Sequence, residues 1–414
     1  MRFVLIRPPF VDLSYGPPIG LAHIQGVLKE AGHECVVFDV NLDLAAEFSW
    51  LGSYSRDFVI SSDEPVYRYA WDAMDAYCDF VRRFEPDVVG FYLTYPTREY
   101  GVEMARRLKG QFRCIAGGPE ASYNEGELLG LGVFDTVVSG YGEEAVLEVP
   151  QRTGIIEKPL VKGRDYTPDY TGIEIERYGG MLPIVTTRGC PRRCNFCTQN
   201  LSYHYQSIDS VLRQIEATPG VKTLMFNDSN INVSHEHAEK LFRGVTDLGL
   251  RHPSHVFGME VSPRHDEYIP WMARSGVFEA RLGLESGSFD ERAAMEKANF
   301  SNDLLVEMVA NLTRHRITTW IQQIFCFPSQ TDEQREESLA LMHRLNRECD
   351  PNYIKQFWYR FVVHTGRERY FEERFGVKQG HMQAWQNELY TPERIDQLGR
   401  EYRERVPENC TLYV

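Results

Sequence analysis

Short apolar segments alternate with amphipathic helical segments along almost the whole chain, and this alternation constrains the fold more than any other feature. Up to about Pro150 the expected strands are Arg2 to Arg7, Glu34 to Val40, Asp87 to Leu93, Phe112 to Ala116 and Thr136 to Ser139, and the expected helices are Ile19 to Ala31, Val66 to Phe84 and Thr97 to Lys109. Strands interleaved with helices form a parallel sheet whose ligands bind at the carboxyl ends of the strands. The sequence therefore predicts an α/β fold that begins with a doubly wound parallel sheet.

A second βα series follows the first. Its expected strands are Leu182 to Thr187, Val221 to Phe226, His255 to Glu260, Glu279 to Leu284, Thr318 to Phe325 and Tyr353 to Phe361, with helices such as Ser207 to Ala217 and Asp303 to His315 between them. The stretch between the two series is rich in Pro, Gly, Asp and Tyr, which is typical of a linker. The predicted division is residues 1–150, a linker at 151–176, a second domain at 177–377 and a polar helical cap at 378–414.

Composition excludes several classes of protein. The chain has 414 residues, of which 43% are apolar and 25% charged, and a net charge of -14 without a Lys/Arg-rich run, which disfavours a nucleic-acid partner. No apolar run approaches the roughly 18 residues of a membrane span, and the N-terminus lacks the zones of a signal peptide. We expect a protein of the cytoplasm with no membrane partner. The acidic balance favours cationic ligands, although its usual meaning is only solubility.

Three of the nine cysteines form a C-x3-C-x2-C cluster in the run TTRGCPRRCNFCTQN, at Cys190, Cys194 and Cys197. Structural zinc takes four ligands in tetrahedral geometry. An iron-sulfur cubane accepts one thiolate at each iron and can leave one iron open for another ligand. Spacing alone leaves a zinc knuckle completed by His204 as an alternative.

Four glycines follow expected strands of the first domain: Gly117 and Gly118 in AGGPEAS, and Gly140 and Gly142 in SGYGEE. Without side chains they let a bound ligand approach the backbone, although ordinary turn chemistry explains them equally well. No G-x-G-x-x-G follows the first strand, which disfavours a nicotinamide-binding domain.

The cysteine segment resembles the signature of the radical SAM superfamily. The motifs FNDSN, LGLESGS, M-x-K at Met295 to Lys297, IFCFPSQT and FVVHTGRERYF follow in the order familiar from the subgroup with an N-terminal cobalamin-binding domain. The resemblance implies a partial (β/α)6 barrel in which the three cysteines hold a 4Fe-4S cluster and S-adenosylmethionine (SAM) chelates the fourth iron. One electron from the cluster would then cleave SAM to methionine and a 5′-deoxyadenosyl radical.

The first domain carries RPPF, GPPIGLAHIQGVLKEAGH, AGGPEAS and SGYGEE, which resemble the cobalamin-binding module of that subgroup. The resemblance implies that cobalamin lies across the four glycines. The D-x-H-x-x-G motif is missing, and His23 and His33 are the only histidines before residue 150. Bound cobalamin is therefore expected to have no histidine ligand on cobalt.

Resemblance also assigns residues to SAM. The backbone next to Phe196 would contact adenine, Asn227 and Asp228 would face the methionine amine, and Glu285 and Ser286 would meet the ribose hydroxyls or the carboxylate, with Glu260 and Arg281 as second contacts. The alternatives are a core position for Phe196 and a solvated turn for Asn227 and Asp228. Because a buried carboxylate needs a paired donor, we expect Arg281 and Glu285 to share a polar network.

Cys326 lies in IFCFP, at a position where relatives commonly have glycine. It is predicted to be a catalytic thiol that gives a hydrogen atom to a substrate radical, against the alternative of a small buried hydrophobe. Gln356, Tyr359 and His364, on or just after the last strand of the second series, are candidates for binding a polar substrate.

The leading functional hypothesis is a radical SAM methyltransferase that takes hydrogen from an unactivated carbon of a small polar substrate, which is expected to be cationic if the acidic balance reflects its ligand. Cobalamin would then deliver a methyl group, in natural-product biosynthesis, and a flavodoxin- or ferredoxin-type protein would donate the electron. Two alternatives stay open: radical dehydration, epimerisation or rearrangement of a sugar or aminosugar without methyl transfer, and a non-catalytic cobalamin-binding protein with a structural cluster.

Overall fold

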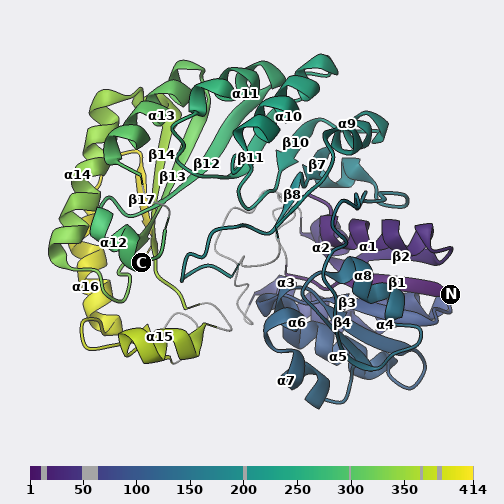
Figure 1. Ribbon diagram of the computed structural model, residues 1–414. Coiled ribbons are helices and arrows are strands. Elements are labelled where there is room, and N and C mark those ends of the chain that lie inside the picture. The colour runs from purple at the N-terminus through teal and green to yellow at the C-terminus, as the bar shows by residue number, and fades with distance from the viewer. Residues whose placement is uncertain are drawn as a thin grey trace. The chain divides into compact units, whose positions relative to one another are not determined.

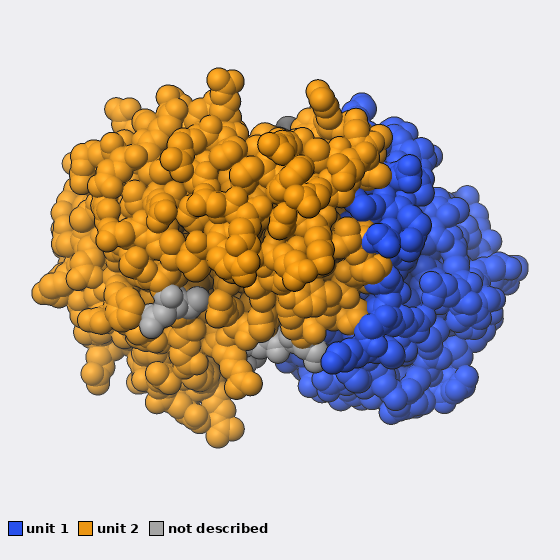
Figure 2. Space-filling model, turned by 45° about the horizontal axis from the view of Figure 1, so that its top comes forward, with its two compact units in different colours: residues 1–183, 209–222 blue, residues 184–208, 223–414 orange. Residues whose placement is uncertain are grey.

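The computed structural model describes residues 1–10, 16–48, 64–198, 203–297, 300–363, 367–379 and 385–413. The chain divides into two compact units, one of residues 1–183 with 209–222 and one of residues 184–208 with 223–414 (Figure 2). The helix α9 (Ile208–Ala217), which follows the cysteine segment in sequence, thus belongs almost entirely to the first unit.

The first unit is built on a six-stranded parallel sheet in the order β2-β1-β3-β4-β5-β6 (Figure 1). Its strands are β1 (Arg2–Arg7), β2 (Glu34–Asp39), β3 (Val88–Tyr92), β4 (Arg113–Gly117), β5 (Thr136–Ser139) and β6 (Gly154–Glu157). Its helices are α1 (Ile19–Glu30), α2 (Val40–Glu47), α3 (Pro65–Asp72), α4 (Met74–Arg83), α5 (Arg98–Leu108), α6 (Pro119–Tyr123), α7 (Glu125–Gly130) and α8 (Gly142–Ala145).

Alternation along β1 shows why the sheet carries helices on both faces. Phe3 and Leu5 pack in one apolar cluster with residues of α1, whereas Val4 and Ile6 pack in another with residues of α4 and α5. Successive strand residues point to opposite faces, so a strand that is apolar throughout must be covered on both sides. The predicted doubly wound sheet is confirmed.

The predicted linker differs from the structure in one element. Residues 154–157 form β6, which pairs with β5 in parallel and ends the sheet. The short apolar pair Ile155 and Ile156 was too brief to stand out among the surrounding Pro, Gly and Asp. The expected single helix from Val66 to Phe84 is likewise two helices, α3 and α4, that meet at Ala73.

The second unit contains a seven-stranded sheet in the order β17-β14-β13-β12-β11-β10-β7, with parallel pairing from β10 to β17. Its strands are β7 (Met181–Ile184), β10 (Thr223–Phe226), β11 (Ser254–Met259), β12 (Val277–Glu285), β13 (Thr318–Phe325), β14 (Ile354–Arg360) and β17 (Cys410–Tyr413). The short pairs are β8 (Thr187–Arg188) with β9 (His204–Tyr205) and β15 (Lys378–Gln379) with β16 (Trp385–Gln386).

Helices cover the outer side of this curved sheet (Figure 1). The helices of the second unit are α10 (His235–Asp247), α11 (Ile269–Ser275), α12 (Phe289–Ala294), α13 (Asn302–Arg314), α14 (Asp332–Glu348), α15 (Glu368–Phe375) and α16 (Pro392–Arg403). Hydroxyl caps start several of them, as in α14, where the Thr331 hydroxyl accepts from the Gln334 amide and the Gln334 side chain accepts from the Thr331 amide. The second unit is therefore a βα series whose curved sheet stays open between its two edge strands, as a partial barrel does.

The C-terminal segment was expected to be a polar helical cap, and the structure adds a strand to it. After α16 the chain forms β17, which pairs in parallel with β14 from Gln356↔Cys410 to Tyr359↔Tyr413 and becomes an edge of the sheet. Four residues at a chain end carry too little pattern for this to be read from sequence. Across the described ranges, no helix has the length and apolar character that spanning a bilayer requires.

Candidate functional site

The three clustered cysteines lie on the loop between β8 and β9, and all three line one cavity of about 470 Å³ in the second unit. The two ends of the loop are held together because β8 and β9 pair, with Thr187 opposite Tyr205 and Arg188 opposite His204. Local spacing and this short ladder together bring the thiols to one wall.

The thiols fit a cubane better than a zinc ion. Within the described ranges, no group of three or more His, Cys, Asp or Glu side chains is arranged to hold a single metal ion. Zinc draws all its ligands to within about 2.3 Å of one centre, whereas each thiolate of a cubane binds a different iron. His204, the proposed fourth zinc ligand, is buried in β9 and does not line the cavity. Burial raises the pKa of the Cys194 thiol to about 11, so metal ligation is what would hold it as a thiolate.

Asp228 anchors the strand end next to the cysteine loop. Its Oδ1 accepts from the Thr186 amide (2.9 Å), the Thr186 hydroxyl (3.0 Å), the Thr187 amide (2.5 Å) and the Thr187 hydroxyl (2.8 Å). Its Oδ2 is buried with no partner among the described residues, and burial raises the pKa of this carboxyl to about 6. Asp228 therefore fixes the loop through one oxygen and keeps the other as an acceptor at the cavity wall.

Two neighbours add acceptors to the same wall. Asn227 is exposed and lines the cavity, and Asn230 lines it with a buried Oδ1 that has no partner in the described part of the chain. A buried acceptor without a donor costs free energy. An ammonium group in the cavity would satisfy these oxygens, which is the fit that the amine of SAM requires.

Two ion pairs lie at the cavity. Glu260, at the end of β11, accepts from Nε of Arg192 at 2.8 Å and from its Nη2 at 2.6 Å. Glu285, at the end of β12, accepts from Nζ of Lys297 at 3.0 Å, and both of these side chains are 13% exposed. Each carboxylate predicted to meet SAM thus has the cationic partner that a buried carboxylate needs.

Arg281 and Glu285 were expected to share one polar network, and they take separate partners instead. Glu285 pairs with Lys297, while the Arg281 guanidinium lies 3.8 Å from the ring centroid of Phe257 and 4.4 Å from that of Trp320. Residues four apart on one strand share a face but lie about 13 Å apart along it, which separates the two side chains.

Ser286 is not at the cavity. Its hydroxyl donates to Glu291 at 2.6 Å and lies 3.1 Å from that of Ser338, in a fully buried network between β12 and α14. The contact with SAM predicted for Ser286 is therefore not supported, because Ser286 is fully buried in this network and only Glu285 of the two residues lines the cavity.

Cys326 is also turned away from the cavity. Its side chain is fully buried in the apolar cluster that includes Phe325, Phe327 and Trp358, and burial raises the pKa of its thiol to about 12. Its φ of +57° lies in the left-handed region, which explains why glycine suits this position. The predicted donor role finds no support in this geometry, and the alternative of a small buried hydrophobe fits.

Of the remaining predicted residues, only one lines the cavity in the described part of the chain. Phe196 is half-buried and lines the cavity, whereas Gln356 is fully buried and donates to the Met342 carbonyl at 3.1 Å beneath α14. Tyr359 points to the other face of β14, and His364 lies outside the described residues.

The four glycines of the first unit lie at or just after strand ends, but they are not equivalent. A Cβ on Gly118 would meet the Leu93 carbonyl oxygen at 2.7 Å, and one on Gly142 would meet Cδ1 of Ile24 at 2.7 Å. A Cβ on Gly117 or Gly140 would find its nearest neighbour at 4.0 Å or 3.9 Å. At Gly118 and Gly142 the close packing requires a residue without a side chain. At Gly117 and Gly140 the backbone has free space beside it, at the carboxyl edge of the sheet.

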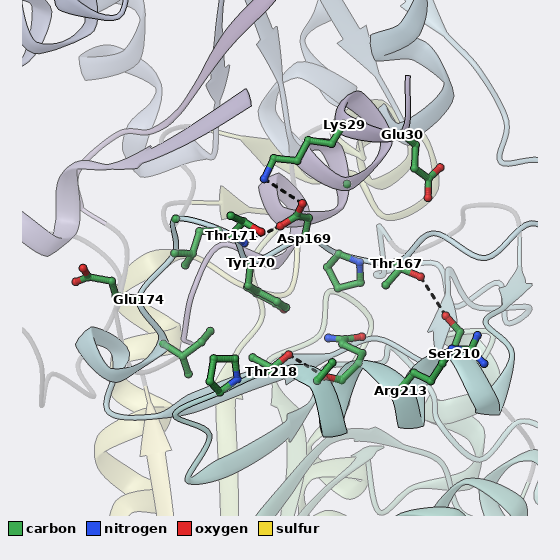
Figure 3. A pocket seen from close by; sticks show the side chains of 18 of the residues that line it. Lys29, Glu30, Thr167, Asp169, Tyr170, Thr171, Glu174, Ser210, Arg213 and Thr218 are labelled. Carbon is green, nitrogen blue, oxygen red and sulfur yellow. Dashed lines mark hydrogen bonds and ion pairs between the residues drawn. The ribbon is translucent and has the colours of Figure 1, made fainter. Parts of the chain in front are cut away.

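A larger cavity, of about 780 Å³, lies within the first unit between the end of α1, residues 167–176 and α9 (Figure 3). The ion pair between Lys29 and Asp169 and the hydroxyls of Thr167 and Ser210 face it. Neither a cysteine nor the carboxyl end of a strand lines this cavity. Its larger volume therefore does not make it the candidate active site.

Sequence reasoning gave no role to Arg192, Lys297 or Asn230. Arg192 stands inside the cysteine run and Lys297 ends the M-x-K motif, so both lie in segments that had already been singled out. Their pairing with Glu260 and Glu285 joins residues 68 and 12 positions apart, and no local pattern indicates which carboxylate each cation takes.

Comparison with known proteins agrees with these two units. Residues 184–342 match the Radical SAM superfamily and residues 12–149 match the B12 binding domain. A radical SAM domain holds a 4Fe-4S cluster and SAM, and a B12 binding domain holds cobalamin. The cofactors expected from the resemblance are those of the matched families.

Individual relatives are distant. Bacteriochlorophyllide d C-12(1)-methyltransferase of Chlorobaculum tepidum is 30% identical over 39% of this chain, which spans only 36% of that relative's length. An uncharacterized methyltransferase of Pyrococcus horikoshii is 20% identical over 84% of this chain and 78% of its own.

Among solved structures, the radical SAM methyltransferase TsrM from Kitasatospora setae, with cobalamin and a 4Fe-4S cluster bound, superposes with a TM-score of 0.71 at 16% identity. The match covers 92% of this chain and 79% of that one, and at this identity it shows a shared fold. The cysteine loop, the two matched domains and the shared fold agree: residues 12–149 form a B12 binding domain, and a radical SAM domain follows it at residues 184–342.

Proposed function

We propose that this protein is a cobalamin-dependent radical SAM methyltransferase acting on a small molecule. The observation that carries the proposal is that three thiols share one cavity with unpaired buried acceptors, Oδ2 of Asp228 and Oδ1 of Asn230. When bound, the cluster and SAM supply radical formation and cobalamin supplies carriage of a methyl group.

The residues of the chain hold and orient these groups. Asp228 and Asn230 accept hydrogen bonds from the SAM amine, and Asn227 stands beside them. Lys297 pairs with Glu285 and Arg192 pairs with Glu260, and these carboxylates would accept from ribose hydroxyls. Phe196 places the loop backbone beside adenine, while Gly117 and Gly140 leave room for cobalamin.

The cofactor part of the proposal is tested by anaerobic reconstitution. We expect about four iron and four sulfide per chain, 5′-deoxyadenosine after reduction with dithionite in the presence of SAM, and corrin absorbance that stays with the protein through gel filtration. A variant with Cys190, Cys194 and Cys197 all replaced by Ala should lose the iron and the 5′-deoxyadenosine but keep the corrin. Deoxyadenosine at the wild-type rate from this variant would reject the proposal.

Methyl transfer and radical chemistry without methyl transfer are distinguished by whether SAM yields a second product besides 5′-deoxyadenosine. Methyl transfer converts SAM to S-adenosylhomocysteine, whereas radical dehydration or rearrangement yields none. Cys326, the thiol that would serve the alternative without methyl transfer, is not at the cavity. A non-catalytic cobalamin-binding protein would form neither product. The flavodoxin- or ferredoxin-type electron donor remains part of the proposal, and comparing such proteins with dithionite tests it.

A further inference from the structure

One face of the sheet in the second unit carries a row of aromatic rings. Trp320 and Phe357 have centroids 4.7 Å apart at an interplanar angle of 29°, Phe357 and Tyr359 lie 5.9 Å apart at 9°, and Tyr359 and Tyr413 lie 5.0 Å apart at 10°. These rings come from β13, β14 and β17 and form a nearly parallel set.

This face is the inner one. Side chains on a strand alternate between faces, and Trp358, between Phe357 and Tyr359, packs fully buried against residues of α16 in the apolar cluster. Gln356 bonds to α14 on that same outer side. The aromatic row therefore lies opposite the helices, where the sheet surrounds the barrel interior.

The row borders residues that line the cysteine cavity. Gln322 lines the cavity and is the register partner of Phe357, and Trp320 stands two residues before it on the same face of β13. Trp320, Tyr359 and Tyr413 are half-buried, whereas Trp358 is fully buried. Half-buried rings inside a barrel present apolar surface to whatever occupies the interior.

Arg281 adds a cation at the base of this row. Its guanidinium lies between the rings of Phe257 and Trp320, at 3.8 Å and 4.4 Å from their centroids. Its Nε and the indole Nε1 of Trp320 are both buried donors with no acceptor among the described residues. Two adjacent unpaired donors call for an acceptor that the described part of the chain does not supply.

The charges around Arg281 leave it partly unneutralised. Oε1 of Glu279 is 3.9 Å from Nη2 of Arg281 but only 3.1 Å from Nδ1 of His255, so one carboxylate serves two partners. Lys355 places a second cation 5.0 Å from the Trp320 ring centroid. Glu260 and Glu285, the carboxylates at the cavity, are already paired with their own cations.

We infer that the substrate carries a planar aromatic or heteroaromatic ring and an oxyanionic group. The ring lies against the half-buried Tyr359 and Tyr413, and the oxyanion, a carboxylate or a phosphate, accepts from Arg281 and Trp320. This inference rests on the proposed function for the reaction itself, and it replaces the cationic substrate suggested by net charge, because the two donors without an acceptor, Nε of Arg281 and Nε1 of Trp320, call for an acceptor on the ligand.

The test uses reconstituted holoenzyme and isothermal titration with small probes. Naphthalene-2-carboxylate has both features, naphthalene-2-carboxamide lacks the charge, and cyclohexanecarboxylate lacks the aromatic ring; naphthyl phosphate compares the two oxyanions. We expect the carboxylate and the phosphate to bind about tenfold or more tighter than the amide and the saturated acid, since stacking and a charged hydrogen bond each contribute about that much.

Variants locate the site. Arg281→Gln should remove the preference for naphthoate over its amide, Arg281→Lys should keep part of it, and Trp320→Leu should weaken both ligands. Arg314→Gln, which changes an exposed arginine of α13, is the matched control and should leave all affinities unchanged.

Equal affinity of the wild type for naphthoate, its amide and cyclohexanecarboxylate would overturn the inference, even if the Arg281 variants did not fold. An unchanged preference in folded Arg281→Gln would also overturn it. The proposed function is judged separately by 5′-deoxyadenosine formation in the wild type, which needs none of these probes, so either idea can fail alone.

Discussion

Glu291 on α12 provides a pH-dependent test of the site's framework. Its side chain is fully buried, and Oε2 accepts from the Ser286 hydroxyl at 2.6 Å and from Nε2 of Gln330 at 3.0 Å, while Oε1 has no partner among the described residues. Gln330 in turn accepts from the Cys326 amide at 2.9 Å. Glu291 thus links the loop after β12 to the loop after β13, and Glu285 is the last residue of β12.

Burial raises the pKa of Glu291 from 4.5 to about 7. Because the folded state holds the proton more tightly than the unfolded state, the stabilisation is complete below pH 4.5 and is lost as pH rises through about 7. The difference corresponds to about 3 kcal/mol of unfolding free energy.

The perturbation is Glu291→Gln, which stays neutral at every pH. The amide leaves a donor where Oε1 had no partner, which costs about 1–3 kcal/mol at all pH values, so the pH-dependent part is the informative one. We expect the wild type to lose about 3 kcal/mol more than the variant between pH 5 and pH 8.5.

Urea unfolding of cluster-free protein at the two pH values measures this, with circular dichroism as the readout and the double difference cancelling all other titrating groups. Glu307→Gln, an exposed position on α13, is the control and should follow the wild type. If the wild type and Glu291→Gln lose the same free energy between the two pH values, Glu291 does not ionise in this range and the reasoning is refuted.

Three further predictions concern the cofactors and the site. Gly117→Leu should reduce corrin retention by filling open space beside the strand end, while Gly126→Leu on α7, where a Cβ meets nothing within 4 Å, should not; equal retention in both would count against a role of Gly117 in holding cobalamin. Cys326→Ala should cost on the order of 1 kcal/mol in urea unfolding without changing 5′-deoxyadenosine formation, and solvent deuterium appearing in the wild-type product would instead revive the thiol donor. Lys297→Met should destabilise the fold by about 3–5 kcal/mol because it strands the buried Glu285 carboxylate, and adding Glu285→Gln should recover most of this loss; a single variant as stable as the wild type would show that the pair is solvated.

Segments whose determinants are local could be predicted. β1, β5 and β13 have the bounds expected from their apolar runs, since each run is itself the element. The cysteine spacing likewise indicates one metal-cluster site without any knowledge of the fold, because Cys190, Cys194 and Cys197 lie within eight residues of one another.

Only the tertiary structure decided to which face the other predicted side chains point and which partners they contact. Ser286 and Cys326 directly follow β12 and β13, and Glu285 is the last residue of β12. The positive φ of Glu285 (+68°) and of Cys326 (+57°) breaks the alternation by which sequence assigns faces. Arg281 was given the wrong partner because its contacts, Phe257 and Trp320, come from neighbouring strands.

The cysteine site is therefore determined by local sequence, whereas the interior surface that receives a substrate is determined by tertiary structure. Three thiols within one loop need only short-range geometry, so the sequence by itself indicated the cluster site and the resemblance to the radical SAM superfamily. The aromatic row and its cation depend on β12, β13, β14 and β17 lying side by side in a fixed register. That register is set by long-range pairing and packing, and no local pattern contains it.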